Sequence, residues 1–429
     1  MTRSRHHRQG LPGVWAELQA LLTIIVLLGV TGCGGGPPGL RGPERPSAID
    51  IPFVRVLIES GAPEAVVTSE GLFTVECLLA KRQTLYQSSR PVRITNRAGR
   101  LQVANRDGLL LEEGLEEINI LPQDRRPLLL GGRPYRGLFK IVPSGPGNVE
   151  VINVVSMEDY LRGVIPPELG KRERNEVEAI KAQAVAARTY ALAHLGQYSN
   201  GRYDLKGDIM DQVYGGAAVE YDLVDRAARE TAGWVAMYND EFIQAYYHST
   251  SGGMTDAIGD VWDRPDLPYL RAVSDSGASS WSKYYRWQEH FSEPQLRQRL
   301  EQYLSAERGV DVRLSPIVDL QTMQRSPGGR VMELVVRTRS DSYRLYKDRI
   351  RWAFRRSSNP DLILPSARFD LDILRDADGN IVRVTFDGGG YGHGVGMCQC
   401  SAIEMSRRGW DYRRILSHFY TGVELRKLY

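Results

Sequence analysis

The chain has 429 residues, of which 42% are hydrophobic and 25% charged, and its formal net charge is +3. The first 32 residues supply +2 of this charge (three arginines less Glu17), so the remainder is nearly neutral. This composition is typical of a soluble globular protein with one large core or a few lobes. It argues against a nucleic-acid-binding protein, which needs a basic face.

The N-terminus has the pattern of a secretory signal peptide. A basic start (Arg3, Arg5, Arg8) precedes an apolar run over residues 18–30 that is short for a membrane span. The run ends in small residues before Cys33, as in the lipobox of bacterial lipoproteins. We therefore predict that residues 1–33 are a lipoprotein signal peptide and that Cys33 is lipidated; an ordinary signal with a chance cysteine is the alternative. Acyl chains would anchor the protein to a membrane outside the cytoplasm, in the cell envelope.

Residues 34–49 are rich in glycine and proline and predict a tether without a core of its own. No later apolar run is long enough to span a membrane. The remaining cysteines, Cys77, Cys398 and Cys400, are too few for a disulfide framework.

Residues 50–155 favour β-strands, because short β-branched runs alternate with turn signals. The expected strands include Phe53–Ile58, Val92–Thr95, Leu101–Val103 and Val149–Val155. We treat this β-rich stretch as an N-terminal part and residues 156–429 as the catalytic core.

Residues 156–429 mix helices and strands. Ser156 is expected to cap a short helix that ends at Gly163, and a long Ala-rich helix is expected over Asn175–Leu195, where Gly196 stops it. Further helices are predicted at Leu223–Thr231, Glu293–Leu304, Ser401–Arg408 and Tyr412–His418, and strands at Trp234–Tyr238, Phe242–Tyr247, Met332–Thr338, Phe369–Arg375 and Ile381–Phe386. Since no regular βαβ rhythm appears, we predict an α+β fold with mixed β-rich lobes around the long helix.

Glu168 is the candidate acid. It follows Pro166 and Pro167, which are expected to forbid a helix and to fix an extended turn. Apolar neighbours would desolvate the carboxyl group and raise its pKa, as a general acid requires. The alternative is a carboxylate that caps the following helix.

Lys181 and Arg188 lie seven residues apart on the long helix and therefore share a face with small alanines. They could orient Glu168 or hold a polar group of a substrate, and Gln183 could reach the same place. A solvated charged stripe is the alternative interpretation.

Two further stretches combine aromatic and polar groups. One carries Gln212 and Tyr214, and the other carries Tyr247, His248 and Ser251 ahead of a Gly-Gly turn. Flat rings suit carbohydrate, although most aromatic side chains simply belong to cores. The evidence for a nucleophilic serine in the second stretch is weak, because this stretch lacks the Gly-x-Ser-x-Gly elbow.

His393 lies in the loop Gly388–Gly396, whose glycine density suggests close backbone approach to a ligand or a structural turn. His393, Cys398 and Cys400 would be the ligands of a metal site. Their spacing is not a standard zinc signature, so we expect no metal and no cofactor.

Taken together, five motifs resemble the stage II sporulation protein D family, which includes the amidase enhancers. They are Glu158 to Glu168, Ala179 to Tyr190, Gln212 to Gly216, His248 to Gly253 and Gly392 to Gln399, and the resemblance runs from about Val54 to Tyr429. It implies a lytic transglycosylase that cleaves peptidoglycan glycan strands stripped of stem peptides, with Glu168 as the catalytic acid.

The resemblance also implies a set of substrate-binding residues: Lys181, Gln183, Arg188, Tyr190, Gln212, Tyr214, Tyr247, His248, Ser251, His393 and Gln399. Some relatives bind zinc through cysteines near the His248 motif; here those positions are Ser249, Thr250 and Ser251, which argues against zinc. Cys400 and Ser401 also depart from the family pattern. A glycan-binding enhancer of a cell-wall amidase, without catalysis, is the alternative function.

Overall fold

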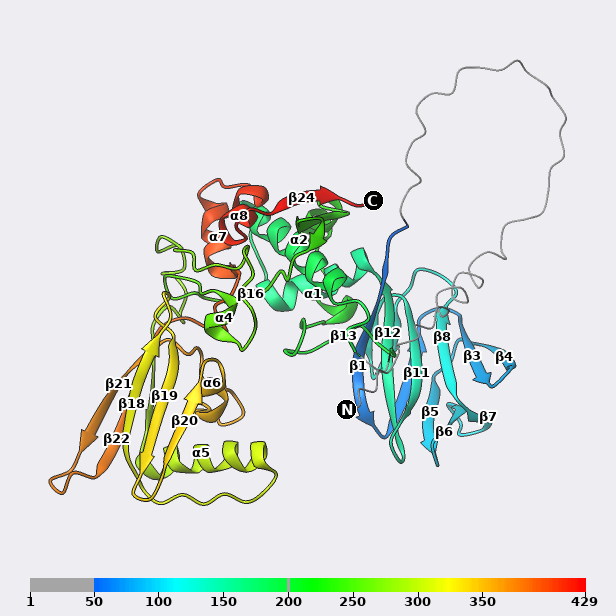
Figure 1. Cartoon of the computed structure of the whole chain (residues 1–429). Coiled ribbons are helices and arrows are strands. Elements are labelled where there is room, and N and C mark those ends of the chain that lie inside the picture. Colours follow the sequence, from blue (N-terminus) through cyan, green and yellow to red (C-terminus); the bar gives the residue numbers. More distant parts are fainter. Residues whose placement is uncertain (1–49, 199–200) are drawn as a thin grey trace, which may run out of the picture. The chain divides into compact units, whose positions relative to one another are not determined.

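The computed structural model describes residues 50–198 and 201–429 (Figure 1). The predicted signal peptide, lipidation site Cys33 and tether lie outside the described residues. In the described ranges, no helix is both long and apolar enough to cross a membrane. Helices and strands occur together in several sheets, which confirms the α+β fold class.

The N-terminal part consists of two β-sheets. Their orders are β13-β1-β12-β11-β8-β3-β4 and β10-β9-β2-β5-β6-β7. Strands such as β2 alternate between buried and partly exposed residues, the pattern of a sheet with one face in a core. The bounds are β1 (Phe53–Ala62), β2 (Glu64–Ser69), β3 (Phe73–Leu79), β4 (Arg82–Ser88), β5 (Val92–Arg97), β6 (Arg100–Asn105), β7 (Leu110–Leu115), β8 (Glu117–Pro122), β9 (Leu128–Leu130), β10 (Arg133–Tyr135), β11 (Leu138–Ser144), β12 (Asn148–Ser156) and β13 (Leu205–Lys206).

A helical layer follows, built around the Ala-rich helix α2 (Val177–Ala193). Its small side chains are almost all buried, because α1, α3, α7, α8 and β14 pack on it from several sides. The bounds are α1 (Met157–Leu169), η1 (Arg174–Glu176), η2 (Gly216–Val219), α3 (Asp222–Glu230), α7 (Gln399–Arg407) and α8 (Tyr412–Phe419), with strands β14 (Trp234–Tyr238), β15 (Glu241–Phe242) and β24 (Glu424–Lys427). One apolar core runs from the sheets into α1 and α2.

A third group of elements has an apolar core of its own. It contains the sheets β17-β22-β21 and β18-β19-β20 and the helices α5 and α6. The bounds are β17 (Trp287–Phe291), α5 (Glu293–Arg308), β18 (Ile317–Arg325), β19 (Val331–Thr338), β20 (Ser342–Tyr346), α6 (Arg349–Ala353), β21 (Phe369–Arg375) and β22 (Ile381–Gly388). This group is drawn in yellow-green to orange in Figure 1, with α5 and α6 beside the sheet of β18, β19 and β20.

The segment that leaves the helical layer and the segment that returns to it lie side by side. There β16 (Tyr247–His248) pairs in parallel with β23 (Met397–Cys398), and the short helix α4 (Ile258–Val261) follows β16. This pairing joins the His248 motif to the glycine-loop motif across about 150 residues of sequence.

Two predicted boundaries are wrong. The helix that Ser156 caps does not stop at Gly163 but continues as α1 to Leu169. The strand expected over Phe242–Tyr247 is interrupted, because the chain bends tightly where the N–H of Tyr246 donates to the carbonyl of Gln244 at 2.8 Å. The other predicted helices and strands of residues 156–429 are present, and the turn at Asp376–Asn380 joins β21 to β22.

Candidate functional site

Glu168 lies in the last turn of α1, and the expectation of an extended Pro-Pro turn is wrong. Pro167 has no N–H to donate to the carbonyl of Gly163 four residues earlier. That carbonyl instead accepts from the N–H of Gly215 at 2.9 Å, and the N–H of Gly170 closes the turn on the Pro166 carbonyl at 2.8 Å. Tertiary contacts thus replace what the prolines remove, and the helix continues to the candidate acid.

The Glu168 carboxyl group is largely buried. Burial raises its pKa to about 7, while hydrogen bonds from the Val213 N–H and from the Gln399 side chain act in the opposite direction. The Val213 N–H lies 2.8 Å from Oε1. The capping alternative does not hold, since Glu173 and Glu176 form the capping box of the next helical segment. The group can therefore hold or release a proton near neutral pH.

Buried amides and phenols surround this carboxyl group. Gln399 Nε2 donates to Gln183 Oε1 at 3.3 Å. Gln212 Nε2 donates to the Tyr247 hydroxyl at 2.9 Å, and the Tyr160 hydroxyl donates to Gln212 Oε1 at 3.0 Å. Among the described residues, Gln183 Nε2 has no hydrogen-bond partner although it is buried. A buried donor without a partner is uncommon in proteins.

The two helix cations lie elsewhere. Lys181 Nζ is 2.7 Å from Glu178 and 2.8 Å from Glu230. The guanidinium group of Arg188 is fully buried and donates twice to Glu158, at 2.8 and 2.7 Å, and to the Trp234 carbonyl. In the part of the chain that the structure describes, no hydrogen bond or ion pair joins either cation to Glu168, so their substrate-binding role stays a prediction.

Tyr190 and Tyr214 are held by interactions within the protein. The Tyr190 hydroxyl donates to Asp211 Oδ1 at 3.3 Å, and its ring stacks on His194. The Tyr214 hydroxyl donates to Asn153 at 2.8 Å inside the core. Asp211, which sequence reasoning did not select, also accepts from Tyr198 and from the backbone of Lys206, and so fixes the loop that carries Gln212 and Val213.

The two motif histidines differ in what their ring nitrogens contact. His393 Nδ1 accepts from the Val395 N–H at 3.1 Å, so its Nε2 carries the proton and donates to the Tyr247 carbonyl at 2.9 Å. Burial lowers the pKa of His393 to about 4. His248 Nδ1 contacts the Val395 carbonyl at 3.2 Å, and its buried Nε2 has no partner among the described residues. Both ring nitrogens of His393 are thus hydrogen-bonded within the protein, whereas, in the described part of the chain, one nitrogen of His248 is not.

Ser251 belongs to a buried hydroxyl cluster around Asp275, a residue that no sequence motif singled out. Its hydroxyl donates to the Asp275 carboxylate, to which Ser279 and Ser401 also donate, at 2.5 and 3.2 Å. The Cys398 sulfur accepts from the Ser251 N–H at 3.2 Å and from Ser401 Oγ at 2.9 Å. Within residues 50–198 and 201–429, no three potential metal ligands come together.

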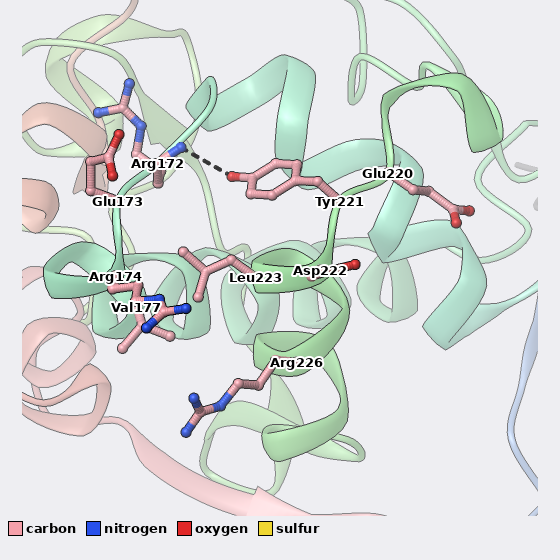
Figure 2. A pocket seen from close by; sticks show the side chains of 9 residues that line it. All are labelled: Arg172, Glu173, Arg174, Val177, Glu220, Tyr221, Asp222, Leu223 and Arg226. Atoms are coloured by element: carbon pink, nitrogen blue, oxygen red, sulfur yellow. Dashed lines mark hydrogen bonds between the residues drawn. The ribbon is translucent and has the colours of Figure 1, made fainter.

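A separate pocket of about 780 Å³ opens beyond the end of α1 (Figure 2). Arg172, Arg174 and Arg226 line it together with Tyr221. The Tyr221 hydroxyl accepts from the Arg172 N–H at 3.2 Å. Sequence reasoning did not find this pocket, because its lining comes from two segments about 50 residues apart.

Comparisons with known proteins give two matching families. Residues 146–238 match the family described as stage II sporulation protein. Residues 278–396 match a family described as a domain of unknown function. The first match covers α1 and α2 and therefore Glu168.

Three relatives extend the similarity over most of the chain. An uncharacterized protein of Brachyspira hyodysenteriae is 30% identical over 325 residues, which are 75% of this chain and 81% of the relative. Stage II sporulation protein D of Bacillus amyloliquefaciens is 28% identical, over 63% of this chain and 74% of its own. The amidase enhancer of Bacillus subtilis is 27% identical, over 62% of this chain and 40% of its own.

Proposed function

Because the chain belongs to the stage II sporulation protein D family, we propose that it acts on the cell wall as a peptidoglycan lytic transglycosylase. The substrate is a glycan strand stripped of stem peptides, and the product carries a 1,6-anhydromuramyl end. The observation that carries the proposal is Glu168, a largely buried carboxyl group whose pKa is raised to about 7.

One carboxyl group is sufficient for this reaction. Protonated Glu168 gives its proton to the glycosidic oxygen as the bond from that oxygen to the muramyl anomeric carbon breaks. The muramyl 6-hydroxyl oxygen then bonds to the same carbon, and its proton returns to the Glu168 carboxylate. No water is consumed. A hydrolase would need a second carboxylate to activate water or attack the sugar.

The groups around Glu168 have roles in this scheme. The Val213 N–H at 2.8 Å and the Gln399 amide stabilise the carboxylate that remains after proton donation. Gln183 Nε2, buried and without a hydrogen-bond partner among the described residues, is the proposed donor to a substrate carbonyl, such as that of an acetamido group. The side chains behind these groups are held in place by hydrogen bonds that join Gln212 to Tyr247 and to Tyr160.

The N-terminal sequence supports a proposed location in the cell envelope. A signal peptide ending at Cys33, with lipid on that cysteine, would hold the protein at a membrane in the cell envelope, where glycan strands are present. Labelling with a radioactive fatty acid tests this, and its loss in a Cys33→Ala protein is the expected result.

A second candidate is a glycan-binding enhancer of a cell-wall amidase that cleaves nothing itself. The similarity to a protein named amidase enhancer favours it. The two functions differ at Glu168, because only the transglycosylase needs its proton.

The test is mass spectrometry of peptide-free glycan strands after incubation with the purified protein and, in parallel, with Glu168→Gln. We expect anhydromuramyl ends only from the unmutated protein. Glu173→Gln is a matched control, since Glu173 follows α1 closely in sequence and caps the helical turn η1. Strands that are bound and left intact by the unmutated protein would refute the enzyme and favour the enhancer.

A further inference from the structure

The segment that matches a domain of unknown function contains a second cavity, of about 590 Å³. Three arginines and two aspartates line it, namely Arg286, Arg325, Arg368, Asp370 and Asp387. It lies at the base of the glycine loop, where β22 ends at Gly388. Nothing in the proposed cleavage reaction uses these residues.

The three arginines are not equivalent. Arg325 is neutralised by Asp370, 2.7 Å away. Arg286 and Arg368 both donate to one backbone oxygen, the carbonyl of Gly252. Across the described ranges, neither forms an ion pair with a carboxylate.

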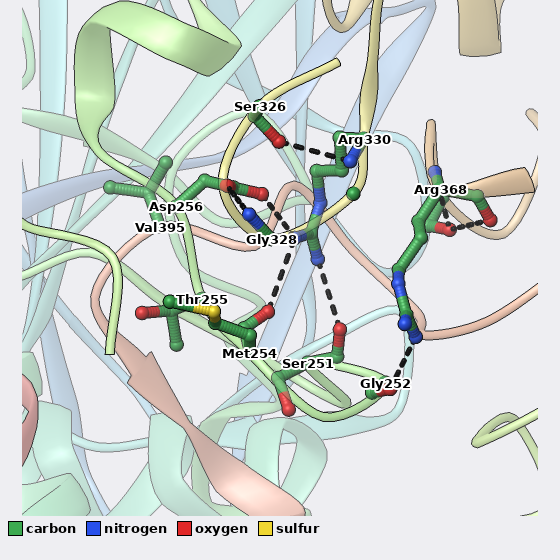
Figure 3. Close-up of polar contacts among 12 residues, drawn as sticks. Ser251, Gly252, Met254, Thr255, Asp256, Ser326, Gly328, Arg330, Arg368 and Val395 are labelled. Atoms are coloured by element: carbon green, nitrogen blue, oxygen red, sulfur yellow. Dashed lines mark hydrogen bonds and ion pairs between the residues drawn. The ribbon is translucent and has the colours of Figure 1, made fainter. Parts of the chain in front are cut away.

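The neighbouring Arg330 has its own carboxylate, because its guanidinium group lies 2.5 Å from Asp256. Figure 3 shows this difference: Arg330 reaches Asp256, whereas Arg368 reaches only the Gly252 carbonyl. Burial and the nearby Arg286 and Arg330 lower the pKa of Arg368. Among the described residues, Arg286 and Arg368 are thus two close cations of which neither forms an ion pair.

Glycines make room for this pair. A Cβ on Gly389 would lie 2.9 Å from Arg368 Nη1 and 3.0 Å from Arg286 Nη1, and one on Gly252 would lie 2.9 Å from Arg368 Nη1. Any larger residue at these positions would push the guanidinium groups apart. The backbone therefore favours two forked donors that face one small space.

Asp387 adds a charge of the opposite sign to the same cavity. Among the described residues, its carboxylate has one hydrogen-bond partner, the Gln288 amide at 3.4 Å. A doubly charged phosphate group would be attracted by the arginines and repelled by Asp387 and Asp370. A ligand with one carboxylate and one nearby ammonium group matches both the positive charge of the arginines and the negative charge of Asp387.

We propose that this cavity binds a wall stem peptide, with a peptide carboxylate on Arg286 and Arg368 and a peptide amine toward Asp387. Planar guanidinium groups bind carboxylates through paired hydrogen bonds. The choice of a wall peptide as the source of the carboxylate rests on the proposed function. The protein would then bind an intact, peptide-bearing strand here while Glu168 acts on a peptide-free stretch.

The test is isothermal titration calorimetry of the full chain with the free tripeptide L-alanyl-γ-D-glutamyl-diaminopimelate, which contains no glycosidic bond. We expect binding that Arg286→Gln weakens about tenfold or more, because a hydrogen-bonded charge is lost. Asp387→Asn should weaken binding of this peptide but not of one with alanine in place of the diamino acid. Arg325→Gln is the matched control and should change affinity little, since Asp370 already neutralises Arg325.

Three results would overturn the proposal: no binding of the peptide, unchanged affinity in Arg286→Gln, or displacement of the peptide by an equal concentration of inorganic phosphate. Gly389→Ala gives a second test that keeps every charge and should also weaken binding. Cleavage of peptide-free strands by Arg286→Gln should equal that of the unmutated protein. Peptide binding without any cleavage activity would therefore refute the proposed enzyme and leave this inference standing.

Discussion

Arg188 gives a sharp test of the structure, because two roles can be distinguished there. The helix pattern predicts a substrate contact, whereas the structure shows a fully buried guanidinium group. Its guanidinium group binds both carboxylate oxygens of Glu158, at 2.8 and 2.7 Å, and the Trp234 carbonyl at 3.0 Å. We predict that Arg188→Met destabilises the protein strongly, since the change leaves the Glu158 carboxylate without its cation.

The magnitude follows from burial. Removing one partner of a buried ion pair lowers the free energy of unfolding by about 3 to 5 kcal/mol. Glu158 retains 19% exposure and the Tyr429 hydroxyl at 2.6 Å, so we expect about 3 kcal/mol, the lower end of that range. Adding Glu158→Gln should restore part of the loss, because no unpaired charge then remains.

The assay is urea-induced unfolding of the unmutated protein, Arg188→Met and the double variant. Lys181→Met is the control, as its ion pairs lie near the surface and should contribute about 1 kcal/mol or less. If Arg188→Met unfolds within about 1 kcal/mol of the unmutated protein but binds glycan more weakly, the buried ion pair is not the role of Arg188.

Three further predictions concern the site and its helix. Because the pKa of Glu168 is about 7 in the folded protein and 4.5 in its ordinary state, the folded protein binds this proton more tightly, and the free energy of unfolding falls as pH rises from 4.5 to 7. Glu168→Gln should therefore gain about 3 kcal/mol relative to the unmutated protein between pH 4 and pH 8; parallel stability curves from urea unfolding would contradict this. Gln399→Leu removes a hydrogen bond to the Glu168 carboxylate, so it should raise the pKa and move the alkaline limb of the cleavage rate upward by about one pH unit, and a downward movement would show that Gln399 does not stabilise the charged form. Gly163→Ala would normally stabilise a helix interior, but its Cβ would lie 2.4 Å from Tyr214 Cε2 and 2.9 Å from the Gly216 carbonyl, so we expect a loss of about 1 to 3 kcal/mol in thermal unfolding; a gain in stability would mean that the Tyr214 ring moves aside freely.

The local patterns of the sequence predicted the element types well and two boundaries poorly. The Ala-rich helix and the cap at Ser156 could be read directly, because their signals lie within a few residues. The continuation of α1 through Pro166 and Pro167 could not, since it depends on the Gly215 N–H, which is distant in sequence. A hydrogen bond between residues distant in sequence thus outweighs the low helix propensity of the two prolines.

In the candidate site, too, some features could be predicted from local sequence and others could not. Glu168 and Gln399 could be selected from their motifs, and the apolar surroundings of Glu168 indicated a raised pKa. The different contacts of Arg188 and Gln183, both on α2, could not be predicted from spacing, because each depends on what packs against its side of the helix. Asp211 directly precedes the motif residue Gln212, and Asp275 lies outside the five motifs. Neither was selected as a site residue, and the hydrogen bonds that converge on them mark their structural importance.

The parallel pairing of β16 with β23 has a consequence for synthesis of the protein. Gln399 follows Glu168 by 231 residues, so a ribosome adding about 5 to 20 residues per second completes the surroundings of Glu168 some tens of seconds after making it. During that interval α2 has no α7 or α8 to cover it, and its alanine-lined surface is open to solvent. The exposed surface of α2 in the nascent chain should thus need protection from aggregation until the last 30 residues emerge. The pairing of β16 with β23 should then be the rate-limiting step of folding.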